Sequence, residues 1–197
     1  MARSDEDLVV AFQGGELSAF DTLLERWERK IRGAVYRIMG SEDEARDLCQ
    51  ETFLKAYRSL PSFKREARFS SWLYQIALNL CRDRMRRKRV RRFVSLDEVD
   101  EAPPETGRAF RPSALELVEA QDLSRAIAEA VESLPEEQRE VIVLKEYQGL
   151  TFLEIADALE LPMSTVKTRL YRGLGQLKER LERQGIRGAA AVPAPLP

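Results

Sequence analysis

The chain of 197 residues is 44% hydrophobic and 33% charged, a composition typical of a soluble globular protein with one larger or two smaller domains. It has two cysteines and no histidine, which argues against His-based catalysis, the usual zinc sites and a disulfide framework. The net charge is −1, but residues 1–93 hold 20 basic against 14 acidic side chains, so a local basic patch for nucleic acid is not excluded.

The first half of the chain has helical periodicity almost throughout. Glycines 14, 15 and 40 and Pro61 separate the apolar stripes. The predicted helices are 5–13, 17–39, 42–60 and 71–92. Cys49 and Cys81 have apolar neighbours within these helices, so we expect both to be buried reduced thiols.

Residues 94–114 change in character, because they contain three prolines, a glycine and five acids without a sustained period. They are predicted to form a linker, and residues 185–197 a disordered tail. The helices predicted between them are 115–133, 136–148, 152–160 and 165–184. The fold class is therefore all-α, with one small helical domain at 1–93 and a second at 115–184.

Two short helices joined by a tight turn are predicted over residues 151–176. Thr151 and Glu154 fit a capping box, Pro162 stops the first helix, and Ser164 can cap the second. The polar side of the second helix has donors of the kind that a helix-turn-helix places in the DNA major groove. These donors are Lys167, Thr168, Tyr171 and Arg172. The alternative is an ordinary helical hairpin with a solvated basic face.

The predicted helix 71–92 has aromatic, amide and basic side chains along one side. These are Trp72, Gln75, Asn79, Arg82 and Arg86, with Tyr74 nearby. Rings can stack on bases while arginines bind phosphates, which suits single-stranded nucleic acid. Residues 82–92 carry eight basic side chains against one acid, a density better explained by a polyanion. The alternative is that the aromatics belong to the core and the arginines only solubilise the helix.

The predicted helix 42–60 has an acidic stripe with one exposed leucine. It comprises Asp47, Gln50, Glu51, Leu54 and Arg58. DNA would repel such a stripe, whereas a basic protein surface would fit it, with charge setting orientation and the leucine providing burial. A solvated helix face is the alternative.

Three segments in this order resemble the bacterial sigma factors of the extracytoplasmic-function type, within the sigma-70 family. They are EDEARDLCQETFLKAYRSLPSF, FSSWLYQIALNLCRDRMRRKRVRR and LPEEQREVIVLKEYQGLTFLEIADALELPMSTVKTRLYRGLGQLKERL. The resemblance covers about residues 5–92 and 115–183. It departs from the usual pattern at Glu160, where helix-turn-helix units often have glycine, so we expect the turn to differ locally.

The resemblance implies three binding surfaces. Asp47, Gln50, Glu51 and Leu54 would contact the clamp helices of the largest subunit of core RNA polymerase. The −10 element would be recognised and melted by the loop 63–69 and the helix after it, through Lys64, Phe69, Trp72, Tyr74, Asn79, Arg82 and Arg86. The −35 element would be approached by Ser164, Thr165, Lys167, Thr168, Tyr171 and Arg172.

The resemblance also implies further partners. These are the polymerase flap, promoter DNA and an anti-sigma factor, while the linker would enter the active-site cleft of the polymerase. We expect no enzymatic activity, cofactor, metal or membrane insertion, and a cytoplasmic location. Two other hypotheses stay open: a stand-alone helix-turn-helix regulator, and an RNA-binding or adaptor protein that uses the 82–92 run.

Overall fold

The computed structural model describes residues 3–64, 68–94 and 116–186, and all regular structure within these ranges is helical. The helices of the first half are α1 (Asp5–Gln13), α2 (Ser18–Met39), α3 (Glu42–Ser59), the 3₁₀ turn η1 (Leu60–Ser62) and α4 (Phe69–Val94). Those of the second half are α5 (Glu116–Glu132), α6 (Glu136–Ile142), the π-helical η2 (Val143–Tyr147), α7 (Phe152–Leu159) and α8 (Met163–Arg183). No helix in the described ranges is long and apolar enough to cross a membrane.

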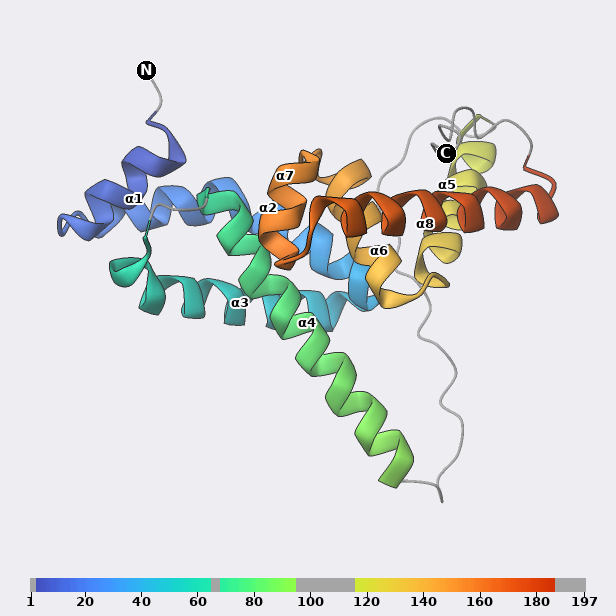
Figure 1. Ribbon diagram of the computed structural model, residues 1–197, viewed down its shortest axis with the longest axis horizontal. Coiled ribbons are helices and arrows are strands. Elements are labelled where there is room, and N and C mark those ends of the chain that lie inside the picture. The colour runs from blue at the N-terminus through green and yellow to red at the C-terminus, as the bar shows by residue number, and fades with distance from the viewer. Residues whose placement is uncertain (1–2, 65–67, 95–115, 187–197) are drawn as a thin grey trace.

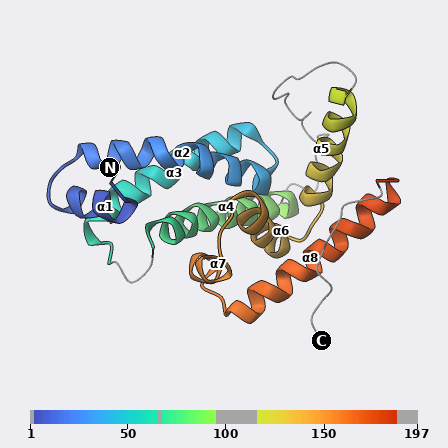
Figure 2. The same cartoon turned by 90° about the horizontal axis from the view of Figure 1, so that it is seen from above.

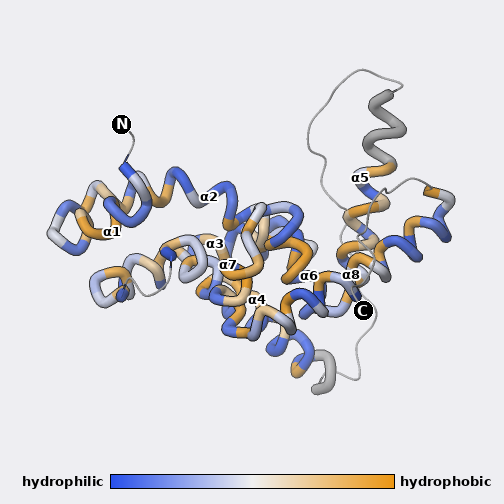
Figure 3. Tube along the Cα trace, turned by 45° about the horizontal axis from the view of Figure 1, so that its top comes forward, coloured by the Kyte–Doolittle hydropathy of each residue, from blue (hydrophilic) through white to orange (hydrophobic). Residues whose placement is uncertain are grey.

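The first half is organised around α2, which contacts α1, α3 and α4 (Figure 2). Most of the apolar stripe of α2 is buried, and Leu23 and Ile31 have no exposed surface. Ser4 and Asp7 form a capping box that starts α1. Gly40 ends α2 in the left-handed conformation, at φ 73°. The projecting end of α4 extends beyond the other helices (Figure 1) and is mostly hydrophilic (Figure 3).

The second half contains the predicted helix-turn-helix, made by α7 and α8. The capping box of Thr151 and Glu154 is confirmed at the start of α7. Glu160 has φ 54° and ψ 45°, so the turn takes the left-handed conformation although it lacks glycine. The expectation of a different local turn at Glu160 was therefore wrong.

The second helix of this unit begins earlier than predicted. α8 starts at Met163 rather than Thr165, and the residue before it is Pro162, whose extended conformation leads into the first turn. The carbonyl of Pro162 accepts from the backbone N–H groups of Thr165 and Val166. Ser164 therefore lies inside the first turn and is not the cap, so the predicted capping role was wrong.

The predicted helix 136–148 is divided into α6 and a π-helical turn. The N–H of Gln148 donates to the carbonyl of Val143 at 3.1 Å, a five-residue spacing. The four residues 141–144 are all at most 1% exposed, because α2, α7 and α8 enclose this segment. The run of apolar residues at 141–144 thus reflects burial on several sides.

The two halves pack directly on each other. α4 contacts α7, and α2 contacts α5 and η2. Arg139 of α6 donates to the carbonyl of Ile38, near the end of α2, at 2.7 Å. α4 ends at Val94, one residue into the predicted linker, and the rest of that linker lies outside the described residues, as does the tail from residue 187 on.

Candidate nucleic-acid and protein interfaces

The predicted acidic stripe lies on the outer surface of α3. Asp47 and Gln50 are exposed, Glu51 is half-buried, and Leu54 leaves 56% of its surface in solvent. Beside Leu54 is a hollow between α2 and α3 with a largely apolar lining. Its lining includes Phe20, Leu24, Phe53, Leu54 and Tyr57. The stripe thus borders a concave apolar surface, which a partner helix with apolar side chains would fit.

Two aromatic residues predicted to contact DNA are buried. Phe69 and Tyr74 are each 1% exposed, and both pack edge-on against Trp27, with ring centroids 6.2 and 5.9 Å away. Burying such large rings contributes much to the stability of a small helical core. Their burial contradicts the prediction that they contact the −10 element, and the alternative that the aromatic residues belong to the core holds for Tyr74. Burial also raises the pKa of the Tyr74 hydroxyl, which donates to Oε1 of Gln148 at 2.9 Å.

The remaining residues predicted for the −10 element lie on or near the surface. Lys64, Asn79 and Arg86 are exposed, and Arg82 is partly exposed. Trp72 is half-buried, with its ring 4.6 Å from that of Phe63. Residues 65–67 of the predicted recognition loop lie outside the described residues.

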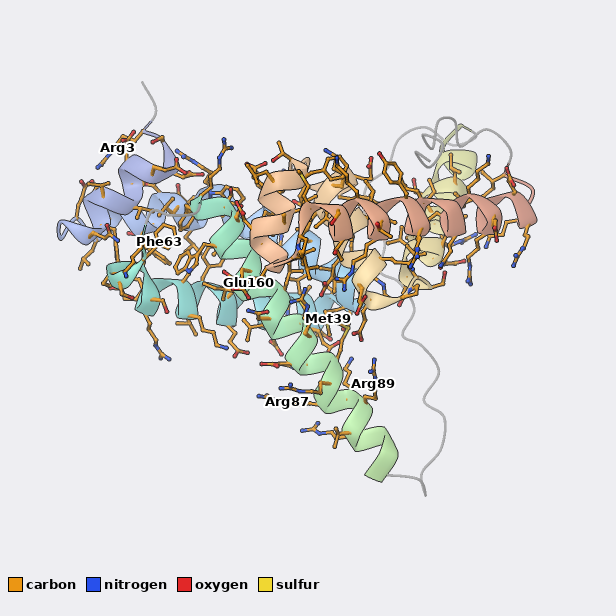
Figure 4. All side chains as sticks on the ribbon, in the orientation of Figure 1. Arg3, Met39, Phe63, Arg87, Arg89 and Glu160 are labelled. Atoms are coloured by element: carbon orange, nitrogen blue, oxygen red, sulfur yellow. The ribbon has the colours of Figure 1, made fainter. Side chains whose placement is uncertain are left out.

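Most of the basic run in α4 is paired with acids, which the local sequence did not predict. Arg84 and Lys88 contact Glu44 of α3 at 3.6 and 2.5 Å. Arg86 pairs with Asp83 within α4 at 2.9 Å. Figure 4 shows Arg87 and Arg89 on the projecting part of the helix. No signal in the sequence indicates Glu44 as a partner, because it is some 40 residues away and only the fold brings it close. The pair of Asp83 and Arg86, in contrast, is local, at an i,i+3 spacing within one helix.

Arg82 and Glu140 form the most buried ion pair of the described residues. Arg82 Nε and Nη2 donate to the two carboxylate oxygens of Glu140 at 2.8 and 2.7 Å. The Glu140 side chain is 2% exposed and that of Arg82 36%. Burial raises the pKa of Glu140, although Arg82 opposes this change, and the bond to Glu140 raises the pKa of Arg82. This is a bidentate ion pair, which is the strong form of the Arg–carboxylate contact.

The predicted DNA-reading surface of α8 is open to solvent. Ser164, Lys167, Thr168 and Arg172 are exposed, and Thr165 and Tyr171 are half-buried. The first turns of α8 line a hollow together with Pro135 and Gln138 of the α5–α6 region, and this lining includes Ser164, Thr165, Thr168 and Arg172. Arg169 pairs with Glu137 at 2.8 Å, whereas Arg172 has no ion pair with a described residue. Arg172 is therefore the arginine of this turn that is available for an external acceptor.

The two cysteines are buried and unpaired, as predicted. Burial raises the pKa of Cys49 to about 11 and that of Cys81 to about 12. Both thiols are therefore protonated near neutral pH, which makes them poor nucleophiles and poor metal ligands.

The geometry agrees with the families that the chain matches. Residues 23–91, which span most of α2 to α4, match Sigma-70 region 2, and residues 124–177 match Sigma-70, region 4. The chain is 35% identical over 170 residues to the ECF RNA polymerase sigma factor SigW of Bacillus subtilis, covering 85% of this chain and 91% of the relative. It is 34% identical to the ECF RNA polymerase sigma-E factor of Salmonella typhimurium, over 86% of this chain and 90% of that protein.

Two solved structures have a similar fold. One is CnrH in complex with the cytosolic domain of CnrY, with a TM-score of 0.69 and 26% identity over 92% of this chain and 99% of the other. The second is the sigma factor RpoE with the anti-sigma factor NepR from Bartonella quintana, with a TM-score of 0.67 and 25% identity over 83% and 96%. The likeness therefore extends over both helical halves.

Proposed function

Because the chain belongs to the extracytoplasmic-function group of the sigma-70 family, we propose that it binds core RNA polymerase through α3 and directs it to promoters read by α4 and α8. One observation supports this most directly. A single chain has an acidic, partly apolar stripe at the surface of α3 and, on α8, an exposed face that carries hydrogen-bond donors. A stand-alone DNA reader would need only the second of these.

The α3 stripe would bind the clamp helices of the largest polymerase subunit. Asp47, Gln50 and Glu51 provide charge and hydrogen-bond acceptors, which orient a basic partner. Leu54 and the adjoining hollow provide apolar surface that is removed from water on binding. Polymerase binding then depends on side chains that the fold leaves at least partly exposed.

The first turns of α8 would read the −35 element. Lys167 and Arg172 point into solvent, and Arg172 is free to bind two acceptors of a guanine. Ser164 and Thr165 lie at the amino end of α8, where backbone N–H groups favour a phosphate. The −10 element would be read through Lys64, Trp72, Asn79, Arg82 and Arg86, on and before α4.

We expect the chain to act in the cytoplasm, without catalytic activity of its own, and to be held by an anti-sigma factor. The last expectation rests on the similar sigma factor RpoE, which was solved in complex with such a factor. Co-purification of the chain at endogenous level, followed by identification of bound proteins, tests it. Recovery of the chain with polymerase subunits alone would contradict it.

The main experiment measures transcription. Purified chain and core polymerase are incubated with a library of genomic fragments, and the RNA 5′ ends are mapped. We expect a small set of start sites that share two upstream elements and that core polymerase alone does not use. A chain that binds duplex DNA tightly but neither binds polymerase nor changes its start sites would refute the proposal and favour a stand-alone regulator.

A pair of variants tests the assigned surface. Asp47→Arg reverses a charge within the stripe and should weaken polymerase binding at least tenfold in a fluorescence anisotropy titration. Glu42→Arg makes the same charge change about 140° around α3 and should leave binding unchanged. Equal effects of both variants would remove Asp47 from the interface.

A further inference from the structure

The end of α1 is joined by hydrogen bonds to the segment that follows α3. The side-chain amide of Gln13, the last residue of α1, donates to the backbone carbonyl of Leu60 at 3.0 Å and to that of Phe63 at 2.9 Å. Leu60 begins the turn η1, and Phe63 directly follows it. The bonds join residues 47 and 50 positions apart, so only the fold reveals them.

The two acceptors lie where helical hydrogen bonding ends. Leu60 directly follows α3, and the last carbonyls of a helix have no acceptor role within it. Pro61 has no N–H to donate, and Phe63 leaves the turn in an extended conformation, at φ −65° and ψ 121°. The carbonyl of Leu60 also accepts from the backbone N–H of Phe63 at 3.1 Å. Gln13 therefore holds both ends of one turn and fixes the direction in which the chain continues to Lys64.

The ring of Phe63 extends this constraint to α4. Its centroid is 4.6 Å from that of Trp72, and the ring of Trp72 is 5.8 Å from that of Phe69. Phe63 thus lies between α1 and the start of α4 (Figure 4). Phe69 is 1% exposed, so one end of this row of rings is fixed in the core. At the other end, the backbone of Phe63 is held by Gln13.

Gln13 itself is not part of the core. Its side chain is exposed, and α1 is anchored instead by the buried side chains of Leu8, Val9 and Phe12. Loss of the Gln13 amide should therefore leave α1 in place. The change should be confined to the turn η1 and to the position of Phe63.

We propose that Gln13 is a positioning residue for reading of the −10 element. It acts through Phe63, so that Lys64 and Trp72 meet the DNA strand in one geometry. The inference deepens the proposed function and rests on it. Stacking on a base and hydrogen bonds to its edge depend on direction, whereas contacts to phosphates carry no sequence information. Loss of Gln13 therefore lowers the discrimination between bases more than the overall affinity for DNA.

The first test uses the free full-length chain. Gln13→Glu keeps the shape of the side chain but replaces the donating amide with an accepting carboxylate, whereas Gln13→Lys retains donors. In Gln13→Glu the backbone amide of Phe63 should exchange with solvent about two- to tenfold faster by NMR, the factor expected for loss of one neutral hydrogen bond. Gln13→Lys should exchange as the wild type does. Unchanged exchange in Gln13→Glu overturns the proposal, whatever the chain does with polymerase.

The second test measures base selectivity in the complex with core polymerase. The complex of each variant is incubated with a randomised single-stranded DNA library, and the bound strands are sequenced. Enrichment of the preferred base over the others should fall about two- to tenfold at one or more positions in Gln13→Glu. Gln13→Lys should restore it, although the two variants change the net charge in opposite directions. A general charge effect acts on all sequences alike and cancels in this ratio.

Glu6→Ala is the matched control. Glu6 is exposed, forms no hydrogen bond or ion pair with a described residue, and lies about two turns before Gln13 on the same face of α1. It should leave both the exchange of Phe63 and the base selectivity unchanged. Every variant should retain the helical circular dichroism and the polymerase affinity of the wild type. Loss of selectivity in the control as well would assign the effect to α1 in general and overturn the proposal.

The two tests distinguish failure of the inference from failure of the proposed function. A wild-type complex that enriches no sequence refutes the proposed function and this inference with it. Normal enrichment by the wild type and equal enrichment by Gln13→Glu refutes only the inference.

Discussion

Gly173 determines how closely α8 approaches α6. It is buried in the middle of α8, and a Cβ added there would lie 2.7 Å from Cδ1 of Ile142 and 3.3 Å from Cβ of Gln138. Ile142 is 1% exposed, so its side chain has little room to move. Gly175, two residues later in the same helix, has nothing within 4 Å of the added Cβ.

The two glycines should therefore respond in opposite directions to alanine. Replacing a helical glycine with alanine stabilises by about 1 kcal/mol. Forcing extra volume into a packed contact costs about 1–3 kcal/mol. We expect Gly175→Ala to raise the free energy of unfolding by about 1 kcal/mol, and Gly173→Ala to leave it unchanged or lower it by up to about 2 kcal/mol.

The assay is urea denaturation followed by circular dichroism. With a slope of about 2 kcal/mol per molar urea, the two variants should differ in midpoint by about 0.5–1.5 M. Ile142→Val removes the Cδ1 atom and should rescue Gly173→Ala, with a coupling energy of about 0.5–2 kcal/mol. Equal stabilisation by both alanines, or no rescue, would refute the close packing of α6 on α8.

Three other experiments test the cap of α7, the burial of the two cysteines and the proposed role of Arg172. Thr151→Ala removes the cap of α7 and should lower the free energy of unfolding by about 1 kcal/mol in the same urea assay, whereas Thr151→Ser should not. Burial raises the pKa of Cys49 to about 11 and that of Cys81 to about 12. At pH 8 both thiols of the folded protein should therefore react with iodoacetamide more than about 100-fold more slowly than those of the protein unfolded in urea. Fast labelling of the folded protein would contradict their burial. Arg172→Ala should cost about 1–3 kcal/mol of binding to the −35 element and relax the preference for one base pair, and an equal loss on all sequences would indicate a phosphate contact instead.

Local signals in the sequence were sufficient for most helices. Capping residues such as Thr151, the glycine at position 40 and the apolar stripes act over one or two helical turns, so they can be read from neighbouring residues. One error, in the predicted helix 136–148, occurred where a local preference met a surface that is distant in the sequence. The π-helical turn at 143–147 belongs to a segment that three other helices enclose.

The proposed functional surfaces divide in the same way. The exposed stripe of α3 and the exposed polar side of α8 follow from helical periodicity, because polar residues on one face of an amphipathic helix remain in solvent. Phe69 and Tyr74 were predicted from the sequence to contact the −10 element. Both are instead buried against Trp27, which lies more than 40 residues earlier in the chain. An aromatic residue is compatible with a base or with a core, and only the neighbours supplied by the fold decide between them.

The sequence by itself determined most of the helices, the cap of α7 at Thr151 and the density of basic residues on α4. The tertiary structure decided what those basic residues contact. Arg82 and Glu140 are 58 positions apart, and Tyr74 and Gln148 are 74 apart. Helix formation depends on hydrogen bonds and side chains within a few residues, whereas an ion pair forms wherever folding brings opposite charges together and removes them from water.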